Sequence, residues 1–359
     1  MARHGGQARI GIIGAGWWAT YAHLPALTGY PHAQIVAIAD PDEARLDAAA
    51  NAFDVARRHG DYRDMLDTEA LDGVIVATPH ATHYEIAREV LSRGLGLMLE
   101  KPMVLRAREA RDLCALATEH KAPLIVGYPY HFVPQHHALK AQLAAGRLGQ
   151  LQLVDNLFAS MVLEYYRANP PAYEQLFAWE VTGPLPDTYS DPDVAGGGQG
   201  HLQVTHAAAL LLWLTGLQPL AVAAFMERFD VRVDLCDAIS VRFAGGTVGT
   251  LASTGGIPTK QAGHQQLEYR IYGSEGYALL DPMAGTCAIH DNDGGVEWLA
   301  PTPAADRYPR EATARHLADV LLGRAENQST GEIGTRTVEL LEAAYRSADE
   351  GRIVRIEEL

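Results

Sequence analysis

The sequence is poor in cysteine, in basic residues and in long apolar runs. Its three cysteines, Cys114, Cys236 and Cys287, have neither paired nor metal-like spacing and predict small buried side chains in a reducing compartment. Lysine and arginine number 29 against 44 aspartates and glutamates, a formal charge of −15. This charge argues against nucleic acid and anionic membrane surfaces as partners. The longest apolar run, residues 207–214, is too short to cross a bilayer.

The composition is otherwise that of a folded globular protein, with 48% hydrophobic and 20% charged residues. A chain of 359 residues is long enough for two domains, since domains run to roughly 100–200 residues. The first residues, MARHGGQAR, contain no apolar stretch and predict no signal peptide. We expect a cytoplasmic protein.

The first third of the chain alternates short apolar runs with longer helical patterns. The apolar runs predict strands at residues 9–13, 35–39, 73–77, 96–99 and 123–127. The stretches between them predict helices at 42–53, 82–93 and 107–119. Uniformly apolar strands separated by helices are typical of a parallel sheet covered on both faces. We therefore expect a doubly wound α/β Rossmann domain over residues 1–128, with its ligand beyond the carboxyl ends of the strands.

The rest of the chain, residues 129–359, predicts an α+β domain. Strands are expected at 150–159, 220–228, 238–243, 247–254, 267–273 and 277–280, and turn pairs such as Gly245-Gly246 suit antiparallel hairpins. Helices are expected at 203–214, 313–322 and 333–347, with a final strand at 353–356. The C-terminal helices are candidates to pack back on the first domain. An open, mainly antiparallel sheet leaves one face to cover, which predicts a homodimer or homotetramer through that face.

A glycine-rich segment after the first predicted strand indicates a dinucleotide site. Gly14 permits a tight turn, Gly16 lets the backbone approach a pyrophosphate, and Ala19 lets helix and strand pack closely. The phosphates would lie at the N-terminus of the helix that follows, beside Trp17 and Trp18.

Asp40 ends the second predicted strand, where an acidic side chain can accept hydrogen bonds from ribose hydroxyls and repel a 2′-phosphate. This position favours NAD over NADP. The alternative is a turn residue, because Asp40-Pro41-Asp42 also indicates a helix start.

Two further motifs follow predicted strands: Thr78-Pro79-His80-Ala81-Thr82-His83 and Glu100-Lys101-Pro102. With the glycines, the string His23-Leu-Pro-Ala-Leu27 and the later stretch from Gly196 through His206 to Gly216, the chain resembles the glucose–fructose oxidoreductase/inositol dehydrogenase (Gfo/Idh/MocA) family over nearly its whole length. The resemblance implies that the first domain binds NAD or NADP and that the substrate lies against the sheet of the second.

The resemblance implies specific roles for the residues of these motifs. Lys101 would be the catalytic acid or base, positioned by Glu100 and a cis Lys101–Pro102 bond, since an ammonium near the reacting hydroxyl can stabilise an alkoxide or exchange its proton. The residues expected at the cofactor are Gly14, Gly16, Trp17, Trp18, Asp40, Thr78, Pro79, His83, Glu100 and Lys101.

The second catalytic region departs from the family pattern. Relatives carry Asp four residues before the histidine found here at position 206, but this chain has Leu202. His206 remains a candidate to hydrogen-bond or protonate the substrate, and its alternative is a satisfied histidine on an apolar helix. Gln203 lies on the same side of the helix and is a candidate to orient the substrate.

Other aromatic residues are candidates to line the cleft. Tyr128 and His131 lie after the last strand of the first domain, where packing between the domains is an equally good interpretation. The irregular segment 163–194 holds Tyr165 among several aromatics and carboxylates, which suit either a carbohydrate or a subunit contact.

These observations predict an NAD(P)-dependent oxidoreductase that transfers a hydride between nicotinamide and a secondary alcohol or ketone of a sugar or polyol, through Lys101 and His206. The alternatives are a redox-assisted lyase or epimerase with tightly held NAD, and a non-catalytic NAD(H)-binding regulator. No metal site is expected, because the histidines at 131, 136 and 137 lack carboxylate or cysteine partners at a familiar spacing.

Overall fold

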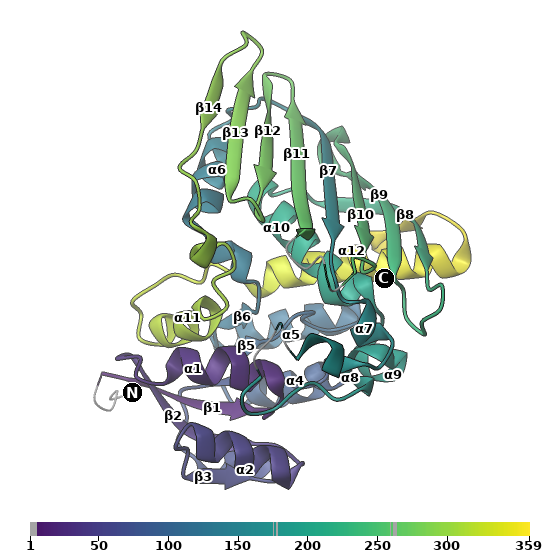
Figure 1. Cartoon of the computed structure of the whole chain (residues 1–359). Coiled ribbons are helices and arrows are strands. Elements are labelled where there is room, and N and C mark those ends of the chain that lie inside the picture. Colours follow the sequence, from purple (N-terminus) through teal and green to yellow (C-terminus); the bar gives the residue numbers. More distant parts are fainter. Residues whose placement is uncertain (1–5, 175, 177–178, 259, 261–263) are drawn as a thin grey trace.

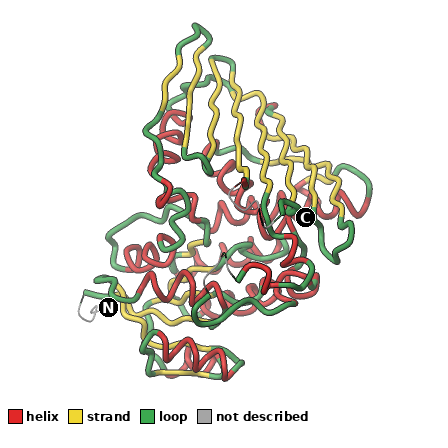
Figure 2. The backbone as a smooth tube through the Cα atoms, in the orientation of Figure 1, coloured by secondary structure: helices red, strands yellow, loops and turns green. Residues whose placement is uncertain are grey.

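The computed structural model describes residues 6–174, 176, 179–258, 260 and 264–359. It contains a six-stranded sheet and a nine-stranded sheet, which occupy opposite halves of the molecule (Figures 1 and 2).

The first sheet is parallel, in the strand order β3-β2-β1-β4-β5-β6. Its strands are β1 (Ala8–Ile13), β2 (Ala33–Ala39), β3 (Arg57–His59), β4 (Gly73–Val76), β5 (Gly96–Leu99) and β6 (Leu124–Val126). The predicted Rossmann architecture is therefore confirmed. The edge strand β3 and the helix α3 (Tyr62–Thr68) were not predicted, because Arg-Arg-His has no apolar pattern and α3 is short.

Helices cover both faces of this sheet. One face packs against α4 (His83–Ser92) and α5 (Ala107–His120), and the other against α1 (Leu24–Leu27) and α11 (Ala312–Leu321). α2 (Glu43–Ala52) lies beside β2 and β3. Gly73 and Gly96 let α11 approach closely, because a Cβ on either would lie within 2.8 Å of the Leu321 side chain. The C-terminal part of the chain thus completes the core of the N-terminal sheet.

The second sheet is mixed and mostly antiparallel, in the order β14-β13-β12-β11-β7-β10-β9-β8-β15. Its strands are β7 (Leu151–Ala159), β8 (Pro219–Glu227), β9 (Cys236–Phe243), β10 (Val248–Thr254), β11 (Gln266–Gly273), β12 (Gly276–Asp281), β13 (Thr286–Asp291), β14 (Val296–Trp298) and β15 (Val354–Arg355). β7 and β10 form its parallel pair. The expected open sheet is confirmed, with β13 and β14 extending it beyond the prediction.

One face of this sheet packs on helices and the other is open. α6 (Pro134–Ala144), α10 (Thr205–Thr215) and α12 (Gly331–Glu350) lie against the covered face (Figure 1). Burial alternates along β9, as expected for a strand with one solvated face. The site described below lies where the helix-covered side of this sheet meets the first one.

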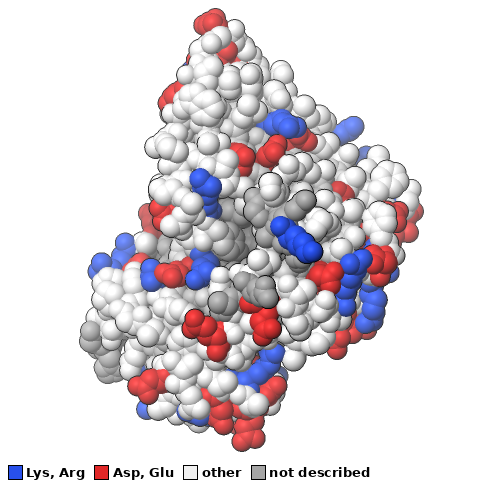
Figure 3. Space-filling model, in the orientation of Figure 1, with Lys and Arg blue, Asp and Glu red and all other residues white. Residues whose placement is uncertain are grey.

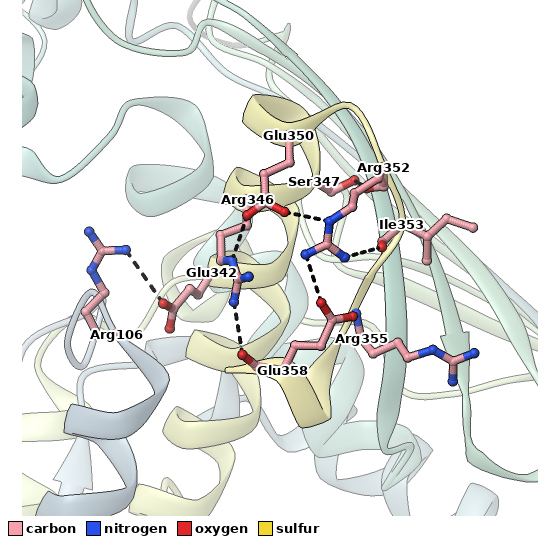
Figure 4. A network of polar contacts seen from close by, with 9 residues as sticks. All are labelled: Arg106, Glu342, Arg346, Ser347, Glu350, Arg352, Ile353, Arg355 and Glu358. Atoms are coloured by element: carbon pink, nitrogen blue, oxygen red, sulfur yellow. Dashed lines mark hydrogen bonds and ion pairs between the residues drawn. The ribbon is translucent and has the colours of Figure 1, made fainter.

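The C-terminal end of α12 carries a network of ion pairs that links it to the last turn of the chain (Figure 4). Arg346 and Arg352 both contact Glu350, and Arg352 also contacts Glu358. On the other side of α12, Glu342 accepts a hydrogen bond from the Ala107 amide and so caps α5. α12 therefore packs against both β8 of the second sheet and α5, which covers the first sheet.

The segment 163–194, predicted to be irregular, forms the short helices α7 (Leu163–Tyr166), α8 (Asp187–Ser190) and α9 (Pro192–Ala195) among loops. Residues 175, 177 and 178 lie outside the described part of the chain. Aromatic side chains from this segment pack together rather than facing solvent, since Tyr165, Tyr166 and Tyr173 are all buried.

Candidate active site

A cavity of about 560 Å³ lies between the two sheets, at the carboxyl ends of β1, β4 and β5. The surface is hollowed between the two halves of the molecule on the face shown in Figure 3. The cavity is lined by Gly16, Trp17, Trp18, Arg45, Ala77, Thr78, Pro79, His80, Glu100, Lys101, Tyr130, Phe158, Met161, Val162, Tyr165, Pro184, Leu185, Thr188, Tyr189, Leu202, Gln203, His206, Gln265, Pro282, Met283, Ala304, Arg307 and Tyr308.

The glycine turn forms one end of the cavity. Gly14 has a φ of 97°, and a Cβ there would lie 2.5 Å from the Ala77 carbonyl oxygen, so only glycine fits. Gly16 borders open space, with a guanidinium nitrogen of Arg45 at 3.8 Å as the nearest atom to a Cβ. A pyrophosphate could therefore approach the backbone at Gly16.

Asp40 faces this turn. One carboxylate oxygen accepts a hydrogen bond from the Ala15 amide at 2.7 Å, and the other accepts one from the Asp42 amide at 2.9 Å. The sequence supports two interpretations of Asp40, either as a residue of the dinucleotide site or as a turn residue at a helix start. Its contacts fit both interpretations, because it holds the glycine turn through Ala15 and the start of α2 through Asp42. The open cradle at Gly16 and the acidic side chain beside it fit the adenosine half of a dinucleotide.

Glu100 is buried at the centre of the site and is fully hydrogen-bonded. Oε1 accepts from the Trp18 indole at 2.9 Å and lies 3.0 Å from Nε2 of His23, and Oε2 accepts from the Lys101 amide at 3.1 Å. Burial alone would raise the pKa of Glu100, but the His23 contact and the Lys101 charge outweigh it, so the pKa is lowered and the carboxylate is charged. Gly127 makes room for it, because a Cβ there would lie 2.8 Å from Oε1.

Lys101 follows Glu100 through a cis Lys101–Pro102 bond, as the resemblance implies. Its ammonium donates a hydrogen bond to the Leu202 carbonyl oxygen at 3.1 Å. Burial lowers the pKa of Lys101 to about 8, against the opposing effect of the Glu100 charge. An amine with this pKa can both accept and donate a proton near neutral pH.

A π-helical turn, η5 (Gly200–Val204), presents Leu202 to Lys101. Such a turn displaces a carbonyl from the ordinary helical hydrogen-bond pattern. Here the Leu202 carbonyl accepts a hydrogen bond from the Lys101 ammonium. Leu202 therefore contacts Lys101 through its backbone carbonyl, and the residue also lines the cavity.

His206 lines the cavity from α10 and hydrogen-bonds none of the residues that the structure describes. Its ring is held by the edges of three tyrosines, Tyr128, Tyr130 and Tyr308, at centroid distances of 6.0–6.2 Å. Burial, and then the nearby Lys101 charge, lower the pKa of His206 well below its ordinary value, so the imidazole is neutral. The geometry therefore differs from that of a satisfied core histidine and leaves the ring available to a ligand.

The remaining predicted residues fall into two groups. Trp17, Trp18, Thr78, Pro79, Gln203 and Tyr165 line the cavity, together with Glu100 and Lys101. Tyr128 and His83 do not line it. Tyr128 lies behind His206 and shares a hydrogen bond with Thr205, and His83 lies between the carbonyl oxygens of Pro102 and Thr78 at 2.9 Å. These placements argue against direct ligand contacts for both residues and make them supports of the site.

Several cavity residues were missed from the sequence. His23 was also missed; it does not line the cavity but contacts Glu100, and it lies inside the string that carried the family resemblance. Arg45 lies five residues after Asp40 on a helix of ordinary composition. Arg307 and Tyr308 lie in an irregular segment that has no periodic pattern, so only the fold brings them to the cavity.

Part of the irregular segment 163–194 crosses the glycine turn. Thr182 donates to the Ala15 carbonyl at 3.2 Å, Arg45 donates to the Gly183 carbonyl at 2.9 Å, and the Trp17 indole donates to the Tyr189 hydroxyl at 2.9 Å. Residues 179–189 therefore form a strap over the cofactor end of the cavity.

Comparison with known proteins identifies the class. Residues 8–128 match the oxidoreductase family with an NAD-binding Rossmann fold, and residues 136–279 match the GFO/IDH/MocA C-terminal domain. The chain thus contains an NAD-binding Rossmann domain of the oxidoreductase type. It belongs to the GFO/IDH/MocA family.

Individual relatives show the range of this family. The chain is 31% identical to the rhizopine catabolism protein MocA of Rhizobium meliloti over 59% of its own length, and it spans 58% of that relative. It is 25% identical to D-xylose 1-dehydrogenase (NADP(+)) 2 of Haloferax volcanii, covering 97% of this chain and 99% of the relative. The crystal structure of GenD2 from gentamicin A biosynthesis, in complex with NAD, is 26% identical and superposes with a TM-score of 0.79 over 99% of this chain and 97% of GenD2.

Two structural features are absent from the described residues. No helix among them is long and apolar enough to cross a membrane. Within the same residues, histidine, cysteine and carboxylate side chains form no group of three that could hold a metal ion.

Proposed function

We propose that the protein is an NAD-dependent dehydrogenase that acts on a secondary alcohol, or the corresponding ketone, of a sugar, sugar derivative or polyol. The observation that carries this proposal is that Lys101 and His206 line the same cavity, the first with a pKa near 8 and the second without a hydrogen-bond partner in the described chain. Relatives named as xylose, apiose and inositol dehydrogenases support the substrate class.

In this proposal, Lys101, His206 and Gln203 have separate roles in the reaction. When bound, the nicotinamide supplies the acceptor or donor of the hydride. In the oxidation, neutral Lys101 takes the hydroxyl proton at Nζ, and in the reduction its ammonium returns that proton. His206 is uncharged and forms a hydrogen bond to a substrate oxygen. Gln203 and the aromatic rings orient the substrate and exclude water.

The test is absorbance at 340 nm with purified protein, NAD or NADP, and a panel of sugars, polyols and their keto forms. A cofactor-linked change with members of the panel is the expected result. Cofactor binding without any change would contradict a dehydrogenase.

Asp40→Ala tests the cofactor preference. Because the Asp40 carboxylate can accept hydrogen bonds from the ribose hydroxyls and repels a 2′-phosphate, its removal should raise the KM for NAD by about tenfold and narrow the gap to NADP. Initial rates with both cofactors measure this, and Asp42→Ala on the same turn is the matched control. An unchanged ratio of the two KM values would show that the ribose is recognised elsewhere.

The strap favours a second candidate, internal redox chemistry with a retained cofactor. Thr182 and Arg45 tie residues 179–189 across the glycine turn, which would slow cofactor exchange. A redox-assisted epimerase or lyase would keep NAD through gel filtration and change the substrate without net absorbance at 340 nm. Product analysis of the panel reactions distinguishes it from the dehydrogenase.

We also propose that the open sheet face forms a contact between copies of this chain. A row of side chains crosses neighbouring strands on that face: Val248, Leu153, Tyr272, Tyr277 and His290. Val248 and Leu153 are 47% and 39% exposed, and the Tyr277 and His290 rings stack at 4.3 Å. An exposed apolar row of this kind is typical of an interface.

Leu153→Asp combined with Val248→Asp should convert the assembly to monomers, because two buried charges would oppose association. Light scattering after size exclusion measures the mass. Phe229→Asp, at an exposed apolar residue off this sheet face, should leave the mass unchanged. A monomeric unmodified protein, or an assembly that survives the double substitution, would contradict the proposal.

A further inference from the structure

The cavity has an excess of positive charge, although the protein as a whole has a formal charge of −15. Lys101, Arg45 and Arg307 line it, against the single carboxylate of Glu100. That carboxylate already accepts hydrogen bonds from its own neighbours. Arg45 lies at the glycine turn, the end assigned to the cofactor. The charge of Arg307 is therefore not accounted for by the cofactor or by the protein.

Arg307 is held in place by backbone atoms rather than by an acid. Its Nε donates to the Thr302 carbonyl at 3.2 Å and its Nη1 donates to the Met283 carbonyl at 2.7 Å. These bonds anchor it to the turn between β12 and β13, through Met283, and to the segment after β14, through Thr302. It forms no ion pair with any Asp or Glu of the described chain, which includes every acidic residue of the sequence. The Nη2 group has no described partner.

Other polar groups that line the same cavity are neutral and have no hydrogen-bond partner in the described chain. Tyr130 and Tyr308 pack edge to face at 5.2 Å, and both lie against His206. Burial raises the pKa of both hydroxyls, so they remain neutral donors. Within the described part of the chain, no hydrogen bond is made by the Gln203 side chain or by either hydroxyl. This wall suits a ligand with several hydroxyl groups and one anionic group.

We propose that Arg307 binds a carboxylate of the substrate, so that the preferred substrates are acidic sugars such as aldonates, uronates and other polyhydroxy carboxylates. A guanidinium anchored at two nitrogens presents its remaining donors in the planar geometry that a carboxylate matches. A phosphate is less well matched, because its nearly two charges would meet the single guanidinium of Arg307. This inference rests on the proposed function, since it names the substrate of the same site.

The experiment compares pairs of compounds that differ only in the acidic group: each uronate or aldonate with its aldose or polyol, and each aldose with its 6-phosphate. The unmodified enzyme should have the highest kcat/KM for the carboxylates. Arg307→Gln should lower that value by about 10- to 100-fold, as expected for loss of a charge-assisted bond, and change the value for the neutral partners by less than about twofold. Arg307→Lys should be intermediate, because it keeps the charge and loses the fork.

Controls separate recognition from folding. Arg324→Gln removes an exposed arginine that does not line the cavity and should change neither value. The KM for NAD should also stay constant in Arg307→Gln, and thermal unfolding reports whether the loop anchored by Arg307 remains folded. If Arg307→Gln fails to fold, Arg307→Lys alone still tests the selectivity.

Three results would overturn the assignment while leaving a dehydrogenase intact: preference for the neutral partners, preference for the 6-phosphates, or an equal loss with charged and neutral compounds in Arg307→Gln. If no compound supports turnover, the proposed function itself has failed. In that case, calorimetry measures the affinity of the NAD complex for the charged and the neutral compound of each pair, and these affinities test whether Arg307 binds a carboxylate. Arg307-dependent binding of the carboxylate member supports it, and equal binding of both members overturns it.

Discussion

Replacing Lys101 by Met should lower kcat by about a thousandfold or more while leaving the Kd for NAD within about twofold. Methionine keeps the length of the side chain and removes its proton-transfer group. The lysine ammonium contacts the Leu202 carbonyl in the cavity, and its pKa of about 8 suits proton exchange with a hydroxyl. Stopped-flow and steady-state rates at saturating substrate measure the loss, and fluorescence titration measures NAD binding.

Lys121→Met is the matched control, because Lys121 is exposed at the end of α5 and lies far from the lining of the cavity. It should retain full activity. Thermal unfolding of both variants guards against a folding defect, since Lys101→Met leaves the Leu202 carbonyl without its donor. Full turnover in a folded Lys101→Met protein would remove Lys101 from the proposed mechanism.

Replacing Glu100 by Gln should shift the pH dependence of the reaction. In the unmodified enzyme, kcat/KM for the oxidation should rise with pH through about 8, because neutral Lys101 is the base and its fraction grows above its pKa. The Glu100 charge raises the pKa of Lys101 against the effect of burial. Its removal should therefore lower that pKa and move the midpoint of the profile to lower pH.

The same substitution should also reduce kcat by disturbing the position of Lys101. Glutamine keeps only one acceptor oxygen, so either the Trp18 indole or the Lys101 amide would face the donor NH2 group in place of the carboxylate oxygen that now accepts from it. Glu119→Gln, on the exposed surface of α5, should leave both the midpoint and kcat unchanged. A profile with the same midpoint in Glu100→Gln would show that Glu100 does not tune the lysine and acts only in packing with Trp18 and His23.

Most of the first sheet could be predicted from the sequence because most of its strands are mainly apolar, and β5 was predicted at its observed bounds. Local pattern also sufficed for the glycine turn, where Gly14 has a conformation and a close contact that only glycine tolerates. The motif Glu100-Lys101-Pro102 was informative for a similar reason, since neighbouring residues at a strand end are placed together by the chain itself. These features depend on short-range geometry, which a sequence records directly.

The tertiary structure decided what surrounds those residues. Lys101 meets the carbonyl of Leu202, and Glu100 meets His23, through contacts that join segments about a hundred and about eighty residues apart. Whether His206 was a satisfied core residue or an available one depended on the tyrosines packed around it, and Tyr128 proved to be one of these supports. Arg307 reached the cavity from a segment without any periodic pattern. The sequence by itself determined the class of fold and the residues that the chain places together locally. Burial and long-range packing set the charge states and the contact partners of those residues, and both exist only in the folded structure, where the two sheets are packed together.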